Sequence, residues 1–261
     1  MSRTPRPHRV TPIAVRAPGR AIALALLALV SATGAEAGCS DSARPRVVWT
    51  DCSKDRLLLD QQDLTGADLT KARLSSTSLT GARLTQAKLV EAELSLTRLD
   101  KADLAGANLE RAAGMRPSFA GSNLSGARLH AAQFSRANFS KAQLSGAQLA
   151  KSELIRSDFS GADLTGADLS KAELSRLAFK GATVTGVNFS YSNLARADLA
   201  AAVLKDVNLT GAYLYLTNLS DADLSGAQGL TAEQLQLACG SPGTKLPSGL
   251  QPPAKWRCND D

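Results

Sequence analysis

A large apolar residue recurs at every fifth position from Leu64 to Leu224 without any change of phase. The series covers 33 positions, of which 25 are Leu, six are Phe, one is Val184 and one is Gly114. Ala precedes most of them by two residues, and Ser or Thr commonly follows, as in residues 162–166 (Ala-Asp-Leu-Thr-Gly). This period limits the folds open to the chain more than its composition does.

A five-residue period fits neither a single helix nor a single strand. In an α-helix each step of five turns about 500°, which distributes the leucines around the whole circumference. In a strand, successive leucines alternate between opposite faces. A coil with one unit on each side keeps every Leu and Ala inside, and the frequent Gly at the last position suits a tight corner. The sequence therefore predicts a solenoid whose coils bury their apolar faces against their neighbours.

Three residue types recur at intervals of 20, which is four units. They are Phe119, Phe139, Phe159 and Phe179; Gly106, Gly126, Gly146, Gly166 and Gly186; and Arg116, Arg136, Arg156, Arg176 and Arg196. The interval predicts four units in each coil, so that like side chains stack on one another. The phenylalanines are expected to form one column on an interior face.

This pattern closely resembles that of the pentapeptide-repeat family, through the central Leu or Phe and the preceding Ala of the units from 64 to 224. The resemblance implies an all-β fold, a right-handed quadrilateral parallel β-helix. At a strand spacing of about 4.8 Å, the units would stack into about eight coils. The expected organisation is a signal peptide at 1–37, an N-terminal cap at 38–58, the β-helix at 59–228, and a C-terminal helix and loop cap with a tail at 229–261.

Residues 1–37 have the features of a cleavable secretory signal peptide. An arginine-rich start precedes a ten-residue apolar core at 21–30, which is too short to span a bilayer. The small residues Ala35 and Ala37 provide a cleavage site, and cleavage after Ala37 predicts a periplasmic or secreted protein. Two alternatives stay open: a lipid anchor on Cys39, which the nearby Glu36 disfavours, and a wrongly assigned start without export.

The formal net charge of +6 comes largely from the predicted signal peptide. Without residues 1–37, 25 basic and 23 acidic residues remain, a net charge of +2. Bulk charge therefore does not indicate a nucleic-acid-binding protein. The aromatic content of only 4% suits a narrow interior built from Leu and Ala.

All four cysteines lie outside the repeats, two at each end. Four cysteines allow three pairings. The stacked coils would separate the two ends by on the order of tens of ångströms, which is beyond the reach of a disulfide. The predicted bonds are Cys39–Cys52 and Cys239–Cys258, formed in an oxidising compartment. Reactive thiols are the alternative.

Both ends of the repeat region carry features expected of caps, since an uncovered solenoid end exposes apolar surface and unpaired strand edges. Trp49, with the preceding valines, is expected to plug the first coil. After residue 227 the period stops, and residues 231–238 predict a short helix. Thr231 and Gln234 form a capping-box pattern, and Gly240 predicts a left-handed stop.

One unit has Gly114 where Leu belongs. Phe134 follows one coil later on the same side, and its ring is expected to fill the space that the missing side chain leaves. A local irregularity without a role and a binding notch are the two interpretations that remain.

The mature chain has little material for catalysis. His130 is its single histidine, and one histidine indicates neither a catalytic triad nor a metal site. Aspartates often precede the central residue, and two of them could resemble a glycosidase pair. Neighbouring units have Asn, Arg or Gln in the same slot, which favours solvated repeat residues. We therefore predict no enzyme activity, no catalytic residue, no cofactor and no metal.

The column Arg116, Arg136, Arg156, Arg176 and Arg196 is the candidate binding site. Stacked guanidinium groups match a polyanion such as lipid head groups, a teichoic acid or lipopolysaccharide chain, or nucleic acid. Lys151 and Lys171 on the preceding side would widen the site. The alternative is a corner where arginine is merely tolerated, and where Glu153, Asp158, Glu173 and Asp198 partly neutralise it.

The sequence favours a non-catalytic structural or interaction scaffold of the bacterial cell envelope, which contacts a protein partner or an envelope polyanion. No small-molecule substrate is evident, and an end-to-end homodimer is an open option. The alternative is a DNA mimic that regulates a DNA-binding protein such as gyrase. The export signal and the nearly neutral mature charge both disfavour this alternative.

Overall fold

The computed structural model describes residues 38–258. The predicted signal peptide, with its cleavage after Ala37, lies outside the described residues. Within 38–258, no helix has both the length and the apolar character that a membrane span requires.

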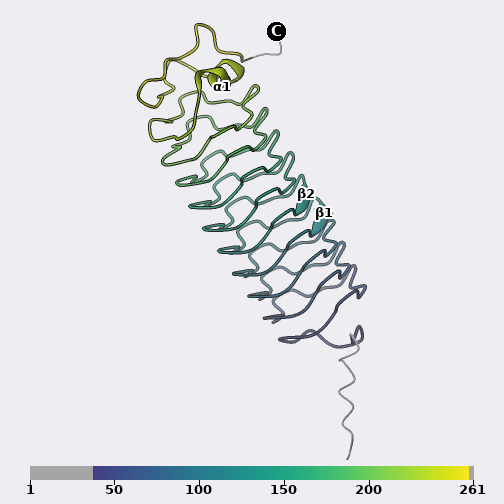
Figure 1. Cartoon of the computed structure of the whole chain (residues 1–261). Coiled ribbons are helices and arrows are strands. Elements are labelled where there is room, and N and C mark those ends of the chain that lie inside the picture. Colours follow the sequence, from purple (N-terminus) through teal and green to yellow (C-terminus); the bar gives the residue numbers. More distant parts are fainter. Residues whose placement is uncertain (1–37, 259–261) are drawn as a thin grey trace, which may run out of the picture. The chain divides into compact units, whose positions relative to one another are not determined.

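The described chain winds into stacked coils of 20 residues (Figure 1). Parallel bridges join the residue before each central position to the residue 20 positions later, from Val48–Asp68 to Asn208–Gln228, with a gap at Thr183. Two strands are long enough to be named: β1 (Ala113–Met115) pairs in parallel with β2 (Gln133–Ser135). The predicted interval of 20 residues, with four units per coil, is therefore confirmed.

Each unit is held by one tight turn and by hydrogen bonds to the neighbouring coils. The amide of Ala67 donates to the carbonyl of Leu64 at 2.9 Å and closes a four-residue turn. Gly66, the third residue of that turn, has a φ of +64°, which glycine adopts without steric cost. The amide of Leu64 donates to the carbonyl of Arg83 in the next coil at 2.7 Å. Repetition of this scheme pairs the backbone while the chain turns four corners per coil.

The interior is filled by the central residues and the alanines that precede them. The phenylalanine column forms as predicted, from Phe119, Phe139, Phe159 and Phe179, all buried. Successive ring centroids are 4.8, 4.7 and 5.7 Å apart, with interplanar angles of 4°, 13° and 24°. This stacking adds to the plain burial of apolar area.

The residue before the central one has a structural role that the sequence analysis missed. Oδ1 of Asp163 accepts a hydrogen bond from the amide of Thr165 at 3.0 Å, and Oδ1 of Asn138 accepts one from Ser140 at 2.9 Å. The equivalent bond forms at Asp63, Asp68, Asp103, Asn108, Asn123, Asp158, Asp168, Asn188, Asn193, Asp198, Asn208, Asn218 and Asp223. Asp and Asn recur in this slot because their side chains accept a hydrogen bond from the amide of the residue that follows the central one.

The backbone ladder begins at Val48, eleven residues before the predicted start of the β-helix at residue 59. Val48 already pairs with the following coil, so the segment 38–58, expected to be a separate cap, supplies part of a first coil. Trp49 takes a central inward position there and is 1% exposed. The predicted disulfide Cys39–Cys52 forms and ties the preceding segment to this coil.

The backbone of the preceding coil explains the glycine at position 114. A Cβ on Gly114 would lie 2.7 Å from the carbonyl carbon of Leu94, so no side chain fits there. Gly114 pairs with Phe134 across β1 and β2. The Phe134 ring is fully buried, 5.5 Å from the ring of Phe119. The irregular unit is therefore a repacked part of the interior.

A short helix, α1 (Ala232–Leu237), follows the last repeats, where the sequence predicts one. Its capping box is confirmed: the Thr231 amide donates to Gln234 Oε1 at 2.9 Å, and the Gln234 amide donates to Thr231 Oγ1 at 3.3 Å. The Gln234 side chain also donates to the carbonyls of Leu209 and Ala212, both at 2.8 Å. The helix is thereby bonded directly to the backbone of the last coils.

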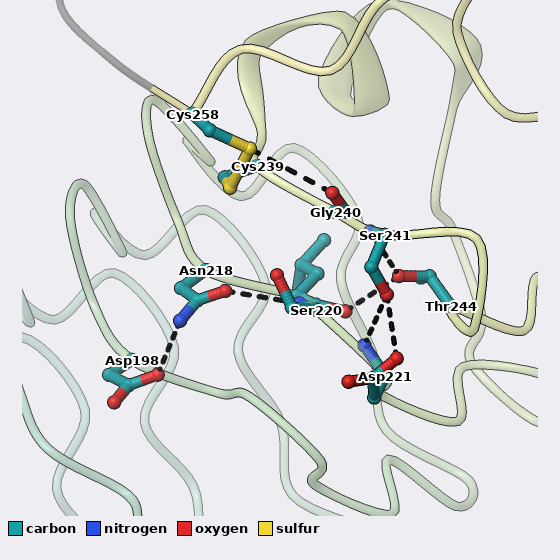
Figure 2. The surroundings of a disulfide bond; sticks show 10 residues. Asp198, Asn218, Ser220, Asp221, Cys239, Gly240, Ser241, Thr244 and Cys258 are labelled. Atoms are coloured by element: carbon teal, nitrogen blue, oxygen red, sulfur yellow. Dashed lines mark hydrogen bonds between the residues drawn. A yellow bond between two sulfur atoms is a disulfide. The ribbon is translucent and has the colours of Figure 1, made fainter.

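The left-handed stop predicted at Gly240 is wrong. The helix ends with Ala238 in an extended conformation (φ −89°, ψ 161°), and Gly240 is not among the residues with positive φ. A Cβ on Gly240 would lie 2.6 Å from Cε2 of Trp256, so the glycine makes room for the indole. The predicted Cys239–Cys258 disulfide holds the tail at this place (Figure 2).

The loop after α1 stays bonded to the last coil although the repeat is interrupted. Figure 2 shows Ser241 between Asp221 and Thr244: its hydroxyl donates to Asp221 Oδ1 at 2.7 Å, and its amide donates to Thr244 Oγ1 at 3.0 Å. Asp223 pairs with Lys245, an offset of 22 residues rather than 20. The C-terminal segment thus extends the parallel ladder beyond the last regular unit.

Candidate functional site

The arginines of the predicted column lie at equivalent corners of successive coils. The amide of Arg156 donates to the carbonyl of Ser175 at 3.0 Å, and Ser175 is the residue directly before Arg176. The amides of Arg116, Arg136, Arg176 and Arg196 make the equivalent bond to the next coil. Consecutive members of the column are therefore one coil apart, about 4.8 Å at ordinary strand spacing.

All five arginines are exposed and have left-handed backbone conformations, with φ between 56° and 59°. The corner two units away uses glycine in the same conformation at Gly106, Gly126, Gly146, Gly166 and Gly186. This conformation costs a residue that has a Cβ roughly 1–2 kcal/mol. Backbone geometry therefore favours glycine and does not explain the five arginines.

Of the acids predicted to neutralise the column, none forms an ion pair with Arg116, Arg136, Arg156 or Arg176 within residues 38–258. Glu153 Oε1 accepts from Gln133 Nε2 at 3.2 Å, and Glu173 Oε2 accepts from Asn193 Nδ2 at 2.8 Å. The remaining two acids, Asp158 and Asp198, likewise accept from amides. Among residues 38–258, Arg116, Arg136, Arg156 and Arg176 have no carboxylate oxygen within 4.0 Å.

A second row of cations lies at the preceding corner. Lys151 and Lys171 precede Arg156 and Arg176 by five residues, and both are exposed. In the described part of the chain neither lysine forms an ion pair, whereas earlier coils contain pairs such as Arg83–Asp63 at 2.9 Å. The charges of these two corners are thus available to an anion outside the chain.

Two of the aspartates that cap turns have lowered pKa values. Bonds from the hydroxyl and then the amide of Thr165 hold the pKa of Asp163 below its usual range. The hydroxyl and amide of Ser225, followed by Lys245, lower the pKa of Asp223 to about 2. Such carboxylates stay ionised at neutral pH, where a general acid needs its proton. Residues 38–258 contain no group of three His, Cys, Asp or Glu side chains placed to hold a metal.

The sequence analysis missed a group of aromatic residues beside the column, which contains all three tyrosines of the chain. Tyr191 takes the corner that Lys171 occupies one coil earlier. Tyr213 pairs with Asn193 on the side next to the arginine corner, and its ring is 6.1 Å from that of Tyr215 at an interplanar angle of 7°. The 20-residue interval that identifies the arginines would also have placed these tyrosines.

Comparison with protein families agrees with this geometry. A model described as a pentapeptide repeat region matches residues 132–209, and one described as pentapeptide repeats (8 copies) matches 58–81, 77–112 and 192–228. The chain therefore belongs to the pentapeptide-repeat family. Proteins of this family are generally non-catalytic binding scaffolds.

Several solved structures are similar to this chain. A trypsin-treated form of QnrB1, a plasmid-mediated fluoroquinolone resistance protein, gives a TM-score of 0.52 at 17% identity, over 74% of this chain and 91% of that chain. HetL, a pentapeptide repeat protein involved in heterocyst differentiation regulation in the cyanobacterium Nostoc sp. strain PCC 7120, is 29% identical over 68% of this chain and 87% of its own, with a TM-score of 0.30. A pentapeptide repeat protein from the Arabidopsis thaliana thylakoid lumen is 30% identical over 48% and 81%, with a TM-score of 0.31. No curated protein gave a significant match. The likeness to QnrB1 supports the fold and carries no inference about function.

Proposed function

We propose that this protein is a non-catalytic binding scaffold of the bacterial cell envelope that contacts a polyanion through its arginine column. One observation carries the proposal. Arg116, Arg136, Arg156 and Arg176 stand one per coil at exposed corners and have no carboxylate partner within 38–258. Guanidinium groups at a regular interval present planar donors to successive phosphate or carboxylate groups.

The location in the envelope rests on the sequence of residues 1–37. The disulfides Cys39–Cys52 and Cys239–Cys258 are consistent with it, because such bonds persist in oxidising compartments. Fractionation of cells, with a check of the mature N-terminus, tests this part. Recovery of an uncleaved chain in the cytoplasm would contradict the envelope location.

The proposal also includes a right-handed winding of about eight coils at ordinary strand spacing, which a crystal structure would test. The alternative function is that of a DNA mimic directed at gyrase. It would need a strongly acidic surface, and the mature net charge of +2 does not provide one.

Retention on heparin at increasing salt tests polyanion binding. The test variant is Arg136→Glu/Arg156→Glu. The control, Lys101→Glu/Lys141→Glu, makes the same change in net charge at exposed left-handed positions of another corner. We expect the arginine variant to elute at much lower salt than the wild type, and the lysine variant to remain close to it. Equal shifts in both variants would show that only net charge matters, and would contradict a role for the column.

A further inference from the structure

One side of the solenoid carries charged rows that end in tyrosines, and we call it the tyrosine-ended face. It has a floor and two corners. The floor is Glu153, Glu173, Asn193 and Tyr213; the first corner is Lys151, Lys171 and Tyr191; the second corner is Arg156, Arg176 and Arg196. Backbone bridges place each floor residue directly against the next, one coil apart.

The floor is polar and keeps hydrogen-bonding capacity. Each glutamate uses one oxygen to accept from an amide side chain, Glu153 from Gln133 and Glu173 from Asn193. No other hydrogen bond within 38–258 uses the second oxygen of Glu153 or Glu173. These oxygens can accept hydrogen bonds from hydroxyl groups, and their negative charge repels anionic groups. A ligand on this face must therefore present hydroxyl groups to the floor and place its negative charges over the two corners.

The two corners supply the cations for such edges. Lys151 and Lys171 line one edge of the floor, and Arg156 and Arg176 line the other, all exposed and without an ion pair in the described residues. Along each edge the charges repeat once per coil, about 4.8 Å apart at strand spacing. This repeat is close to the length of one pyranose ring in an extended polysaccharide.

The tyrosines form an aromatic platform at one end of the face. A Cβ on Gly211 would lie 2.7 Å from Cδ1 and Cε1 of Tyr191, so the Tyr191 ring lies against the backbone of the next coil. Tyr191 is 62% exposed and Tyr213 is 48% exposed. The Tyr213 ring stacks on that of Tyr215. Exposed rings with such contacts offer an apolar surface to the C–H groups of a sugar ring, at little entropic cost.

From these contacts we propose that the polyanion is a linear acidic polysaccharide that lies lengthwise along the tyrosine-ended face. Its carboxylate or phosphate groups contact the lysine and arginine corners, its hydroxyls donate to Glu153 and Glu173, and a sugar ring packs on Tyr191 and Tyr213. The inference rests on the proposed function and narrows it to one class of ligand. DNA fits less well, because its internal sugars have no free hydroxyl to donate to Glu153 and Glu173.

Binding to polymannuronate, a linear β-1,4-linked uronic acid polymer, tests the proposal. The comparison ligands are dextran, single-stranded oligothymidylate, and vesicles of phosphatidylcholine with phosphatidylglycerol, all at the same near-physiological salt. We expect the wild type to bind polymannuronate, to bind oligothymidylate and vesicles at least several-fold more weakly, and not to bind dextran.

Substitutions of exposed tyrosines separate the sugar contact from the charge contact. Tyr191→Ala/Tyr213→Ala should weaken polymannuronate binding roughly tenfold, as expected for the loss of aromatic stacking, and should leave the weaker binding to the phosphatidylglycerol vesicles unchanged. Tyr191→Phe/Tyr213→Phe keeps the rings and should bind polymannuronate like the wild type.

Two outcomes would overturn the inference in distinguishable ways. If oligothymidylate or the vesicles bind as tightly as polymannuronate, or if the alanine variant binds polymannuronate normally, the polysaccharide proposal fails while polyanion binding stands. If the wild type binds none of the anionic probes and is not retained on heparin, the proposed function itself fails.

Discussion

The ammonium nitrogen of Lys54 lies 3.9 Å from the centroid of the Trp49 ring, inside the first coil. Lys54 occupies a position where the repeat otherwise has leucine, and it is 7% exposed. Its Nζ also donates to the carbonyl of Cys39 at 2.6 Å, and Cys39 is held in place by its disulfide with Cys52. The N-terminal end is thus closed around a buried cation that has an aromatic face and a carbonyl as partners.

Replacement of Lys54 by methionine should stabilise the protein. Burial lowers the pKa of Lys54 from 10.5, against a smaller opposing effect of Asp41. The folded state therefore holds this proton less tightly than the unfolded state, so the charge costs stability at neutral pH, and the cost falls as pH approaches 10.5. We expect Lys54→Met to raise the free energy of unfolding by about 1 kcal/mol at pH 7, and by less at pH 9.5.

Urea denaturation at the two pH values measures this effect. Lys54→Ala is the control, because it removes the charge but leaves a cavity, and it should destabilise the protein. A methionine variant less stable than the wild type at pH 7 would mean that the contacts with Trp49 and Cys39 outweigh the cost of burial.

Replacement of Gly114 by leucine, the usual central residue of the repeat, should destabilise the protein. A Cβ at Gly114 would meet the backbone of Leu94 at 2.7 Å, and backbone cannot move aside as a flexible side chain can. Gly114→Leu should cost roughly 1–3 kcal/mol, as overpacking does. Thermal unfolding of Gly114→Leu beside Gly114→Ala measures the cost. A variant with a raised melting temperature would show that the glycine is a defect rather than a fitted residue.

Two buried serines should respond to alanine in opposite directions. Ser152 Oγ is buried and has no hydrogen-bond partner among the described residues. Ser157 Oγ donates to the Phe134 carbonyl at 3.1 Å and accepts from the Ala137 amide at 3.0 Å. We expect Ser152→Ala to stabilise by about 1 kcal/mol and Ser157→Ala to destabilise by about 1–2 kcal/mol. Chemical denaturation measures the free energy of unfolding of both variants. Equal changes in the two variants would contradict the assigned hydrogen bonds.

Acid should weaken the turns that aspartate caps. The folded-state pKa values of Asp163 and Asp223 lie below the ordinary value of 3.8, about 2 for Asp223. Their stabilising contribution is therefore complete above about pH 4 and is lost as pH falls toward 2. Asp163→Asn/Asp223→Asn keeps the acceptor for the turn amide but cannot titrate.

We expect the double asparagine variant to lose less stability than the wild type between pH 6 and pH 2.5, as measured by denaturant unfolding monitored by circular dichroism. Parallel losses in the two proteins would place the acid sensitivity at other carboxylates. The asparagine already found at this slot in residues 138 and 188 forms the same turn bond, so the substitution should not disturb the fold.

The regular part of this protein could be predicted from the amino-acid sequence because its interactions are local and repeated. An unbroken period of five admits a dry interior only in stacked four-unit coils. The phenylalanine column, the disulfide pairs Cys39–Cys52 and Cys239–Cys258, and the alignment of the arginines all follow from that period. The capping box of Thr231 and Gln234 could also be predicted, because it depends on two residues only three positions apart.

Tertiary structure alone decided the features that depend on contacts between distant residues. Gly240 makes room for Trp256, and Lys54 is buried against Trp49 and Cys39. Glu153 and Glu173 accept hydrogen bonds from side-chain amides of adjacent coils. None of these follows from the period, because each depends on which atoms two separate segments bring within bonding distance. The sequence by itself determined the winding and the rows of side chains, and the packing between coils and at the two ends decided which of those side chains remain available to a ligand.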